Sequence, residues 1–176
     1  MRLTIRSSGP RRRATLSSYA SWPRPLTSSV RRHRGVMDIS RGFQIEQPAV
    51  FVPWGISEAA LKKLFEPGAL RHVTSGYFTV SCNSLGGLAH NLGFHFQPRE
   101  AGALSELEFF RASYPDQAAS FTEFQRHLEA SFGPPTATKP GTEGFSSYLW
   151  QLQGADVVHY LFDRFGPEEH VRIRRQ

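Results

Sequence analysis

Two histidines occupy matching places in the two halves of the chain, and they are the residues best suited to chemistry. His90 is followed two residues later by Leu92, and His159 in the same way by Leu161. If the halves pack about a pseudo-twofold axis, the two imidazoles could meet and bind a metal ion or work as an acid and a base. The alternative is that each histidine is partly buried and satisfied where it stands, because each shares a strand face with a leucine.

The rest of the sequence gives catalysis little support. It contains no His-Glu-x-x-His, Cys-x-x-Cys or comparable ligand spacing. Asp163 lies four residues after His159 in an expected strand, about 13 Å along the chain at ~3.3 Å per residue, which is too far for a hydrogen bond. Cys82 is the single cysteine, so it can form no intrachain disulfide, and its alternating surroundings are typical of a small core residue. The sequence therefore predicts no cofactor and no metal site, and it favours a protein that is not an enzyme.

Charged residues gather around a second feature, the Gly166-Pro167 turn. They are Asp163, Arg164, Glu168, Glu169 and His170. An arginine–carboxylate pair could hold the turn, or the group could serve as a charged recognition loop or as a carboxylate pair for acid–base work. The turn at residues 98–100 has the same proline, arginine and glutamate types, which favours a recurring structural role.

Residues 1–36 differ in composition from the rest of the chain. They contain nine arginines, frequent serine and three prolines, with no lysine, aspartate or glutamate, and this composition predicts disorder. Residues 37–176 keep 12 basic residues against all 15 acidic ones, a net charge of −3. Three interpretations of the tail stay open: a stretch upstream of a true start at Met37, an organellar transit peptide, or a basic arm that binds nucleic acid or an anionic membrane. No apolar run reaches the ~18 residues of a membrane span.

The elements that would position these residues occur twice in the same order. A helix is expected from Ser57, and a second from a capping box at residues 120–123. Each presents apolar residues on one side and is followed by alternating segments that read as antiparallel strands. These segments are residues 77–82, 88–96 and 104–111 after the first helix, and 146–152, 156–163 and 170–174 after the second.

Individual residues also recur at an offset of 67 to 69 positions. Leu61, Phe65 and Pro67 recur as Leu128, Phe132 and Pro134; Thr74 and Gly76 recur as Thr142 and Gly144; His90, Leu92, Phe96 and Pro98 recur as His159, Leu161, Phe165 and Pro167. The matches stay in order, as an old duplication with two small indels would leave them. The sequence thus predicts an internal repeat over residues 56–111 and 120–174.

The fold expected for residues 37–176 is a single α+β domain of two helix-plus-antiparallel-sheet units. The order is β-α-β-β-β and then α-β-β-β-β, with both helices on one face of the sheet. The other face is left open. Candidate contact residues are the polar and aromatic groups of that face, with the charged turn: His95, Tyr148, Trp150, Asp163, Arg164, Glu168 and Glu169.

This layout over most of residues 56–174 resembles the tandem helix-plus-sheet repeats of the beta-lactamase inhibitor proteins and of the related outer-membrane assembly lipoprotein BamE. A helix that ends in Phe-Gly-Pro-Pro, residues 132–135, is the local match. Those families usually have two helices per repeat, with disulfides or a lipidated cysteine, and this chain departs from them in both respects. The stretch 163–170 is also similar to small uncharacterised bacterial proteins. The first resemblance implies protein binding through the sheet and carries over no catalytic residue.

The function expected from the sequence is that of a cytoplasmic bacterial protein-binding module, comparable to an inhibitor or to an immunity protein against a toxin. The acidic domain suits a basic partner such as a toxin or a nuclease. Two other functions stay open. One is a small hydrolase or metal-dependent enzyme that uses His90 and His159. The other is a nucleic-acid binder, which requires the arginine-rich tail to be part of the protein.

Overall fold

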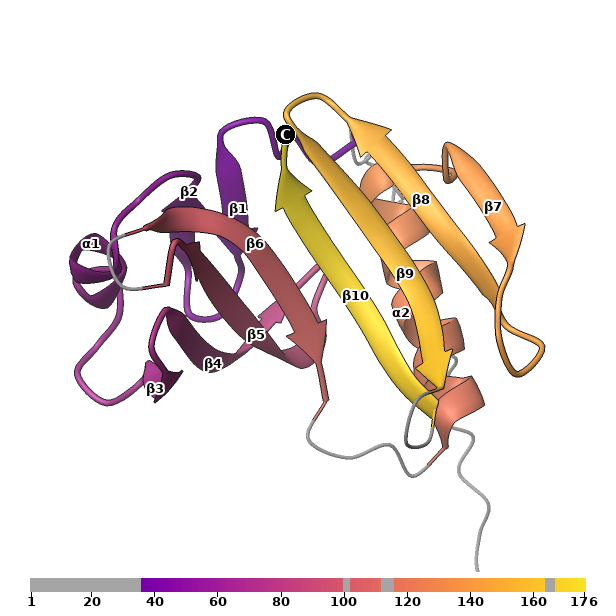
Figure 1. Cartoon of the computed structure of the whole chain (residues 1–176), viewed down its shortest axis with the longest axis horizontal. Helices are drawn as coiled ribbons and strands as arrows, with labels where there is room; N and C mark the ends of the chain where they lie inside the picture. The colour runs from indigo at the N-terminus through magenta and orange to yellow at the C-terminus, as the bar shows by residue number, and fades with distance from the viewer. Residues whose placement is uncertain (1–35, 100–101, 112–115, 164–166) are drawn as a thin grey trace, which may run out of the picture. The chain divides into compact units, whose positions relative to one another are not determined.

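The structure is a computed structural model that describes residues 36–99, 102–111, 116–163 and 167–176. Within these ranges it contains ten strands and two helices (Figure 1). In chain order they are β1 (Gly42–Ile45), β2 (Val50–Pro53), α1 (Glu58–Lys62), β3 (Arg71–Thr74), β4 (Tyr77–Ser84), β5 (Leu88–Gln97), β6 (Ala103–Phe110), α2 (Gln117–Phe132), β7 (Ala137–Pro140), β8 (Ser146–Leu152), β9 (Ala155–Asp163) and β10 (Pro167–Arg175).

Eight of these strands form one antiparallel sheet in the order β3-β4-β5-β6-β10-β9-β8-β7. Each run of four is a meander whose sequence neighbours pair, which requires only short turns. The last strands of the two runs, β6 and β10, pair at the centre of the sheet, with Phe109 opposite Val171 and Leu107 opposite Ile173. The two runs therefore join into one continuous sheet.

One face of this sheet is covered and carries the core. Alternation along the strands sends Phe78 of β4 and Phe94 of β5, which are paired, into this core, while their neighbours face the other way. The two-stranded β1–β2 sheet packs here through Phe43, whose ring meets that of Phe109 edge-on at 5.3 Å. Phe65, just after α1, meets Phe94 at 5.8 Å. In Figure 1, α2 lies behind β8, β9 and β10.

The two helices begin for different local reasons. Ser57 caps α1 as expected, because its hydroxyl accepts a hydrogen bond from the Ala60 amide. The prediction for α2 was wrong at its start: Asp116 is the N-cap and accepts from the Ala119 amide, so Ser120 lies inside the helix. The expected apolar stripe is confirmed, since the α2 side buried against the sheet holds Phe121, Phe124, Leu128 and Phe132.

The described residues therefore form a mainly antiparallel β structure with two helices, which agrees with the α+β class at that level. The expected element order was wrong in detail. Two short paired strands, β1 and β2, precede α1, and four strands rather than three follow it, because the exposed strand β3 has no apolar alternation to reveal it. The description of the two halves as duplicated units stays a prediction.

Two other expectations concern the ends of the chain and the membrane. The tail interpretations, including the nucleic-acid-binding arm, fall on residues 1–35 and so lie outside the described residues. Within the described part of the chain, neither helix has the length and apolar character needed to cross a bilayer.

Candidate functional site: the open face of the sheet

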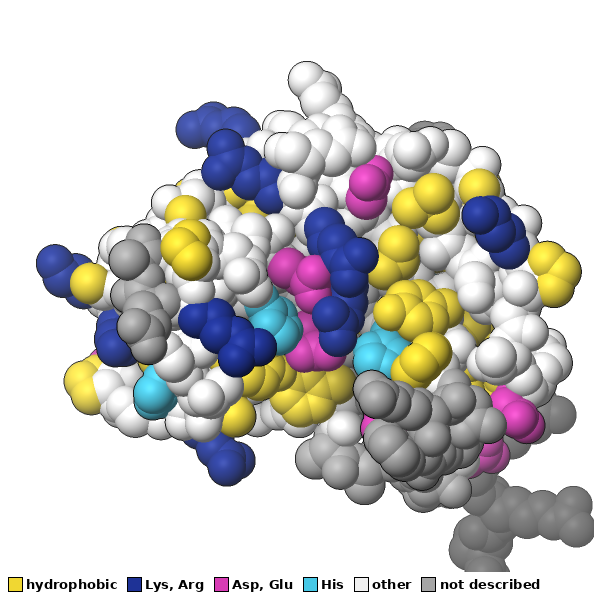
Figure 2. All heavy atoms as spheres, viewed as in Figure 1, with side chains coloured by type: hydrophobic (Ala, Val, Ile, Leu, Met, Phe, Trp, Pro, Cys, Tyr) yellow, Lys and Arg dark blue, Asp and Glu magenta, His cyan; other side chains and the backbone are white. Residues whose placement is uncertain are grey.

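The face of the sheet opposite the core, called the open face below, is not covered by any helix or strand that the structure describes (Figure 1). The strand registers place a row of side chains across it. From β3 to β7 this row reads Arg71, Thr79, Gly93, Glu108, Arg172, Val158, Leu149 and Ala137. Arg71 and Thr79 thus lie on the β3–β4 side, an acid–base pair at the centre and apolar residues on the β9–β7 side. Figure 2 shows the same division, with acidic and basic side chains side by side at the centre and apolar ones over β8 and β9.

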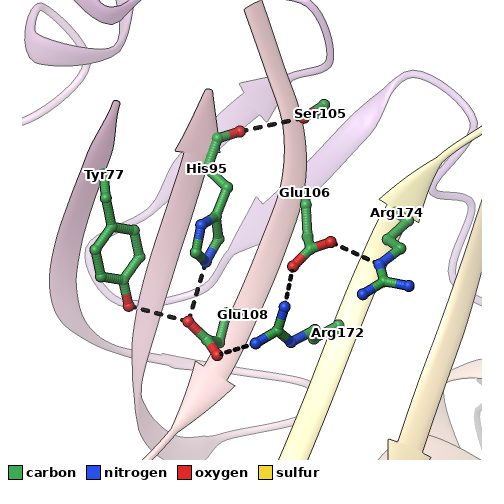
Figure 3. Close-up of polar contacts among 7 residues, drawn as sticks. All are labelled: Tyr77, His95, Ser105, Glu106, Glu108, Arg172 and Arg174. Carbon is green, nitrogen blue, oxygen red and sulfur yellow. Dashed lines mark hydrogen bonds and ion pairs between the residues drawn. The ribbon is translucent and has the colours of Figure 1, made fainter. Parts of the chain in front are cut away.

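The centre of the open face is a connected set of ionic and polar side chains, called the charged ridge below. It consists of Tyr77, His95, Glu106, Glu108, Arg172 and Arg174 (Figure 3). The Arg172 guanidinium donates to Oε1 of Glu106 at 2.7 Å and to Oε1 of Glu108 at 2.8 Å. Arg174 Nε donates to Oε2 of Glu106 at 2.6 Å. Because β6 supplies the acids and β10 the arginines, the charged ridge bridges the pairing at the middle of the sheet.

Glu108 is the most connected member of the charged ridge. Its Oε2 accepts from His95 Nε2 at 3.0 Å and from the Tyr77 hydroxyl at 3.1 Å. Burial raises the pKa of Glu108, but the hydrogen bond from His95 and the charge of Arg172 outweigh it and hold the pKa at about 2. Burial, and then the Glu108 charge, raise the pKa of Tyr77. Glu108 is therefore an anion and Tyr77 a neutral donor at neutral pH.

Some hydrogen-bond donors of the charged ridge make no hydrogen bond with the described residues. Nε of Arg172 is buried and makes no hydrogen bond with any described residue. Arg174 presents a side chain that is 52% exposed and meets Glu106 through Nε alone among the described residues. Burial lowers the pKa of Arg172, but the charges of Glu108 and Glu106 outweigh it and raise that pKa overall. The exposed Arg174 guanidinium can donate to a further anionic or carbonyl oxygen.

A shallow hollow and an apolar patch lie on either side of the charged ridge. The hollow, about 450 Å³, lies over β3 to β6 and is lined by residues that include Val73, Tyr77 and Phe110. The apolar patch on β9 and β8 contains Leu149, Val158, Tyr160 and Phe162, and the Phe162 side chain is 47% exposed. Tyr160 stacks on His170 of β10 at 5.2 Å between ring centroids. Large side chains that remain exposed next to fixed charges are typical of a surface that receives a partner.

Several residues predicted from the sequence are not on this face. Tyr148 and Trp150 face the core, and the Trp150 side chain is fully buried with its indole N–H donating to the Gly133 carbonyl at 2.8 Å. Glu169 is also buried, whereas Glu168 is exposed. His95 does lie on the open face. The side chain of Asp163 and the whole of Arg164 lie outside the described residues.

The two candidate catalytic histidines are both buried in the core beneath the sheet. The ring of Phe124 contacts both, at 6.3 Å from His90 and 6.4 Å from His159. No group of three or more potential metal ligands occurs among the described residues. In the sheet, β6 and β10 lie between β5, which carries His90, and β9, which carries His159.

His90 nevertheless forms a polar pair of its own. Its Nε2 lies 2.6 Å from the hydroxyl of Ser84 and its Nδ1 lies 3.1 Å from the carbonyl oxygen of Asn91. Burial lowers the pKa of His90 to about 4, so the ring is neutral and Nδ1–H donates to the carbonyl. The arrangement has the groups of a serine–histidine pair, but Ser84 is completely buried. Burial also raises the pKa of Cys82 to about 12, so its thiol is not ionised.

The members of the ridge that sequence reasoning missed left a usable signal. Glu106 and Glu108 alternate in one strand, and Arg172 and Arg174 alternate in another. Like charges two residues apart in a strand lie on one face, so each strand presents charges of a single sign to its neighbour. Only the pairing of β6 with β10 shows that the two sets meet.

Comparisons with known proteins do not place the chain in a family. No family model matches it, and no curated protein matches it. Among solved structures, a DUF4309 family protein (YjgB) from Bacillus subtilis subsp. subtilis str. 168 aligns with a TM-score of 0.38 and 13% identity, over 82% of this chain and 90% of that one. At this score the likeness supports no conclusion about fold or function.

Proposed function

We propose that this chain is a non-enzymatic protein-binding module, comparable to an inhibitor or an immunity protein, that docks its partner on the open face. The observation that carries the proposal is the one-sided covering of the sheet. The two helices and the β1–β2 strand pair all pack on the core face, and the opposite face presents the charged ridge between the hollow and the apolar patch. A sheet with one free face has the breadth that a folded partner needs.

The composition of the open face supports a protein partner in particular. Tyrosine, arginine and phenylalanine are enriched at protein–protein interfaces, and Tyr77, Arg172 and Phe162 are present on this face. The ridge is already rigid because its ion pairs fix the side chains in place, so docking costs little further side-chain entropy. The shallow hollow offers a small molecule little enclosure.

The charge expected of the partner is less uniform than the sequence implied. A basic partner follows from the net charge of −3 on residues 37–176. The ridge itself sets two glutamates against two arginines, and Glu169 of the acidic turn is buried. We infer a partner surface that alternates in charge where it meets the ridge and is apolar where it meets Phe162.

We also propose that the two halves arose by duplication. The segments α1-β3-β4-β5-β6 and α2-β7-β8-β9-β10 have the same order, and their last strands pair about the centre of the sheet. Matched residues occupy matched places: Gly76 and Gly144 both adopt positive φ in the turn after the first strand, and His90 and His159 both lie buried in the third strand. Solved coordinates in which the halves do not superimpose would contradict this origin.

The docking proposal can be tested with a photo-crosslinking residue at single positions of the full chain, expressed in its source cells. We expect adducts from Leu149 and Thr79, which lie on the open face, and none from the matched controls Thr122 and Arg126, which are exposed on the outer side of α2. Adducts that form from α2 but not from the open face would contradict the proposal.

Once a partner is identified, a double variant provides the quantitative test. Arg174→Ala with Phe162→Ser should weaken the complex at least tenfold, because both side chains are exposed on the docking face. Lys63→Ala, on the exposed end of α1, is the control and should leave the affinity unchanged. An immunity role further predicts that the chain protects cells from the partner's toxicity and that the double variant does not.

A further inference from the structure

A second polar cluster lies in the core, beneath α2 and away from the open face. His159 of β9 and Glu169 of β10 point into it, and their side chains are 0% and 1% exposed. Nε2 of His159 lies 3.0 Å from Oε1 of Glu169. The stacking of the Phe121 ring on the imidazole, at 3.9 Å between centroids, closes the pair off from water.

Residues of α2 supply the other contacts of the pair. Nδ1 of His159 lies 2.8 Å from Oε1 of Gln125, whose amide nitrogen in turn donates to Oε1 of Glu129 at 2.8 Å. The Ser120 hydroxyl donates to Oε2 of Glu169 at 2.7 Å, and the Gln117 amide donates to the same oxygen at 3.4 Å. The pair therefore connects one helix to two strands.

The hydrogen bonds of His159 and Glu169 require one more proton than a neutral imidazole and an ionised carboxylate carry between them. Both ring nitrogens of His159 face oxygen atoms that accept hydrogen bonds, but a neutral imidazole has a single N–H. If Nδ1–H donates to Gln125, a second proton must lie between Nε2 and the Glu169 carboxyl. Without it, two acceptors would stand 3.0 Å apart in the core.

Burial leads to the same conclusion independently. Turning the Gln125 amide over would let Nε2–H donate to Glu169, but the amide oxygen would then face the Glu129 carboxylate. It would also leave an ionised Glu169 in the core with direct hydrogen-bond partners that are all neutral, and burying such a charge is unfavourable. Burial lowers the pKa of His159 despite the hydrogen bond and charge of Glu169, so the ring cation is disfavoured. One proton held between Nε2 of His159 and Oε1 of Glu169 leaves the pair without a net charge.

Few other titratable groups lie around the His159–Glu169 pair, and each of them makes contacts of its own. From the loop after β6, Nη1 of Arg111 lies 3.3 Å from the Ser120 hydroxyl, and this arginine is paired with Glu123 of α2. From β8, the Tyr148 ring lies 6.1 Å from the imidazole. From α2, Glu129 is reached through Gln125. On β10, the neighbours Glu168 and His170 point to the opposite face of the sheet. On β5, His90 contacts the same Phe124 ring that His159 contacts.

We propose that His159 and Glu169 hold one shared proton at neutral pH and that this proton acts as a latch fastening α2 to the sheet. With the proton present, each donor along Ser120, Glu169, His159, Gln125 and Glu129 meets an acceptor. Loss of the proton sets Nε2 against Oε1 and places a net negative charge beneath the helix. The inference does not depend on the docking proposal.

The latch fixes how stability responds to pH. In the unfolded chain histidine titrates near 6.5 and glutamate near 4.3, so above pH ~6.5 the unfolded pair binds less than one proton. The folded pair still holds one, and stability therefore falls as pH rises, by up to about tenfold in the folding equilibrium constant per pH unit. Below pH ~4.3 the unfolded pair binds two protons, so the same pair loses stability on acidification as well.

Replacing Glu169 by glutamine tests the latch in the full chain. The amide that Glu169→Gln introduces has the shape and the donor of a protonated carboxyl, so it can donate to His159 without a titrating proton. We expect this variant to fold. Between pH 7 and 9 the folding equilibrium constant of the wild type should fall by up to about tenfold per pH unit because of the latch, and that of the variant should lack this fall. The control is Glu168→Gln, the exposed neighbour on the opposite face, which should keep the wild-type slope. Equal slopes in the Glu169 variant and the wild type would overturn the proposal.

The ring itself provides a second readout that needs no variant. Long-range ¹H–¹⁵N spectra of the wild-type chain at pH 7 should show His159 carrying a proton on Nδ1. A neutral ring protonated on Nε2 alone would overturn the shared proton, because Glu169 would then be an ordinary carboxylate acceptor. This measurement decides the question even if the Glu169 variant does not fold.

Discussion

Gly93 allows Tyr77 to lie flat across the middle of the open face. A Cβ at this position would come within 2.7 Å of the Tyr77 ring and of its hydroxyl oxygen. Gly93→Ala should therefore displace the ring and break its hydrogen bond to Glu108, destabilising the protein by about 1–3 kcal/mol. Urea unfolding measures this cost.

A double-mutant cycle supplies the control for this residue. In a Tyr77→Ala background the ring is gone, and Gly93→Ala should then be neutral or slightly stabilising, because alanine favours a strand over glycine. An equal cost in both backgrounds would show that the ring is not what limits the position.

Glu108 should make the protein sensitive to acid. Its pKa of about 2 lies below the ordinary 4.5, so its contribution to stability is complete above pH ~4.5 and is lost as pH falls towards 2. Glu108→Gln should cost on the order of 2 kcal/mol at pH 6, allowing for solvent screening, and almost nothing at pH 2. Urea unfolding at a series of pH values gives both figures.

Glu66→Gln is the matched control for the acid series, because Glu66 is exposed just after α1. This variant should follow the wild type throughout. If the Glu108 variant instead ran parallel to the wild type from pH 6 to pH 2, the ion pairs of the ridge would contribute nothing to stability.

The candidate site residues show which positions the sequence alone could predict and which it could not. Alternation correctly put His95 outward, since its neighbours Phe94 and Phe96 are apolar. The same logic failed for Tyr148 and Trp150, because Leu149 between them is also apolar and both faces of β8 looked equally suited to the core. The partners of Arg172 lie more than 60 residues away in sequence, so only the strand order reveals them.

At the scale of elements, the start of α2 separates two interpretations of one segment. The sequence offers Ser120 and Glu123 as a capping box, but Asp116 forms the cap and Ser120 reaches Glu169. Asp116→Ala should cost about 1 kcal/mol by leaving a first-turn amide without its acceptor. Asp116→Asn keeps an acceptor and should be nearly neutral, which makes it the control. Chemical unfolding with far-UV circular dichroism measures both, and a full cost in the asparagine variant would contradict the cap.

The elements that the sequence predicted well are those with a strong one-sided pattern. The stripe of α2 and the alternation of β4 and β5 bury large apolar groups on one side only, so their periods are visible. Strand β3 is exposed at every position and pairs only with β4 at the sheet edge, so its sequence shows no alternation of apolar and polar residues. The helix start was missed because two acceptable capping residues occur four positions apart, and packing against Glu169 decides between them.

At the scale of the whole described domain, the two halves of the sheet share one core. Phe124 of α2 contacts His90 of β5, and the Arg111 guanidinium lies over the same ring at 5.0 Å. The amide of Met37, ahead of β1, donates to the Ser131 carbonyl at the end of α2. With the pairing of β6 and β10, these contacts make neither half independent of the other, so the domain should unfold in a single transition.

Matched core variants in the two halves test this unity. Leu92→Ala in β5 and Leu128→Ala in α2 each remove a fully buried side chain and should cost about 2–5 kcal/mol. Because the core is shared, each variant should lower the midpoint of a single unfolding transition. Near-UV circular dichroism and hydrogen exchange in strands of both halves should report the same change. Two separable transitions, each moved only by the variant in its own half, would show instead that the pairing of β6 with β10 joins two units that fold on their own.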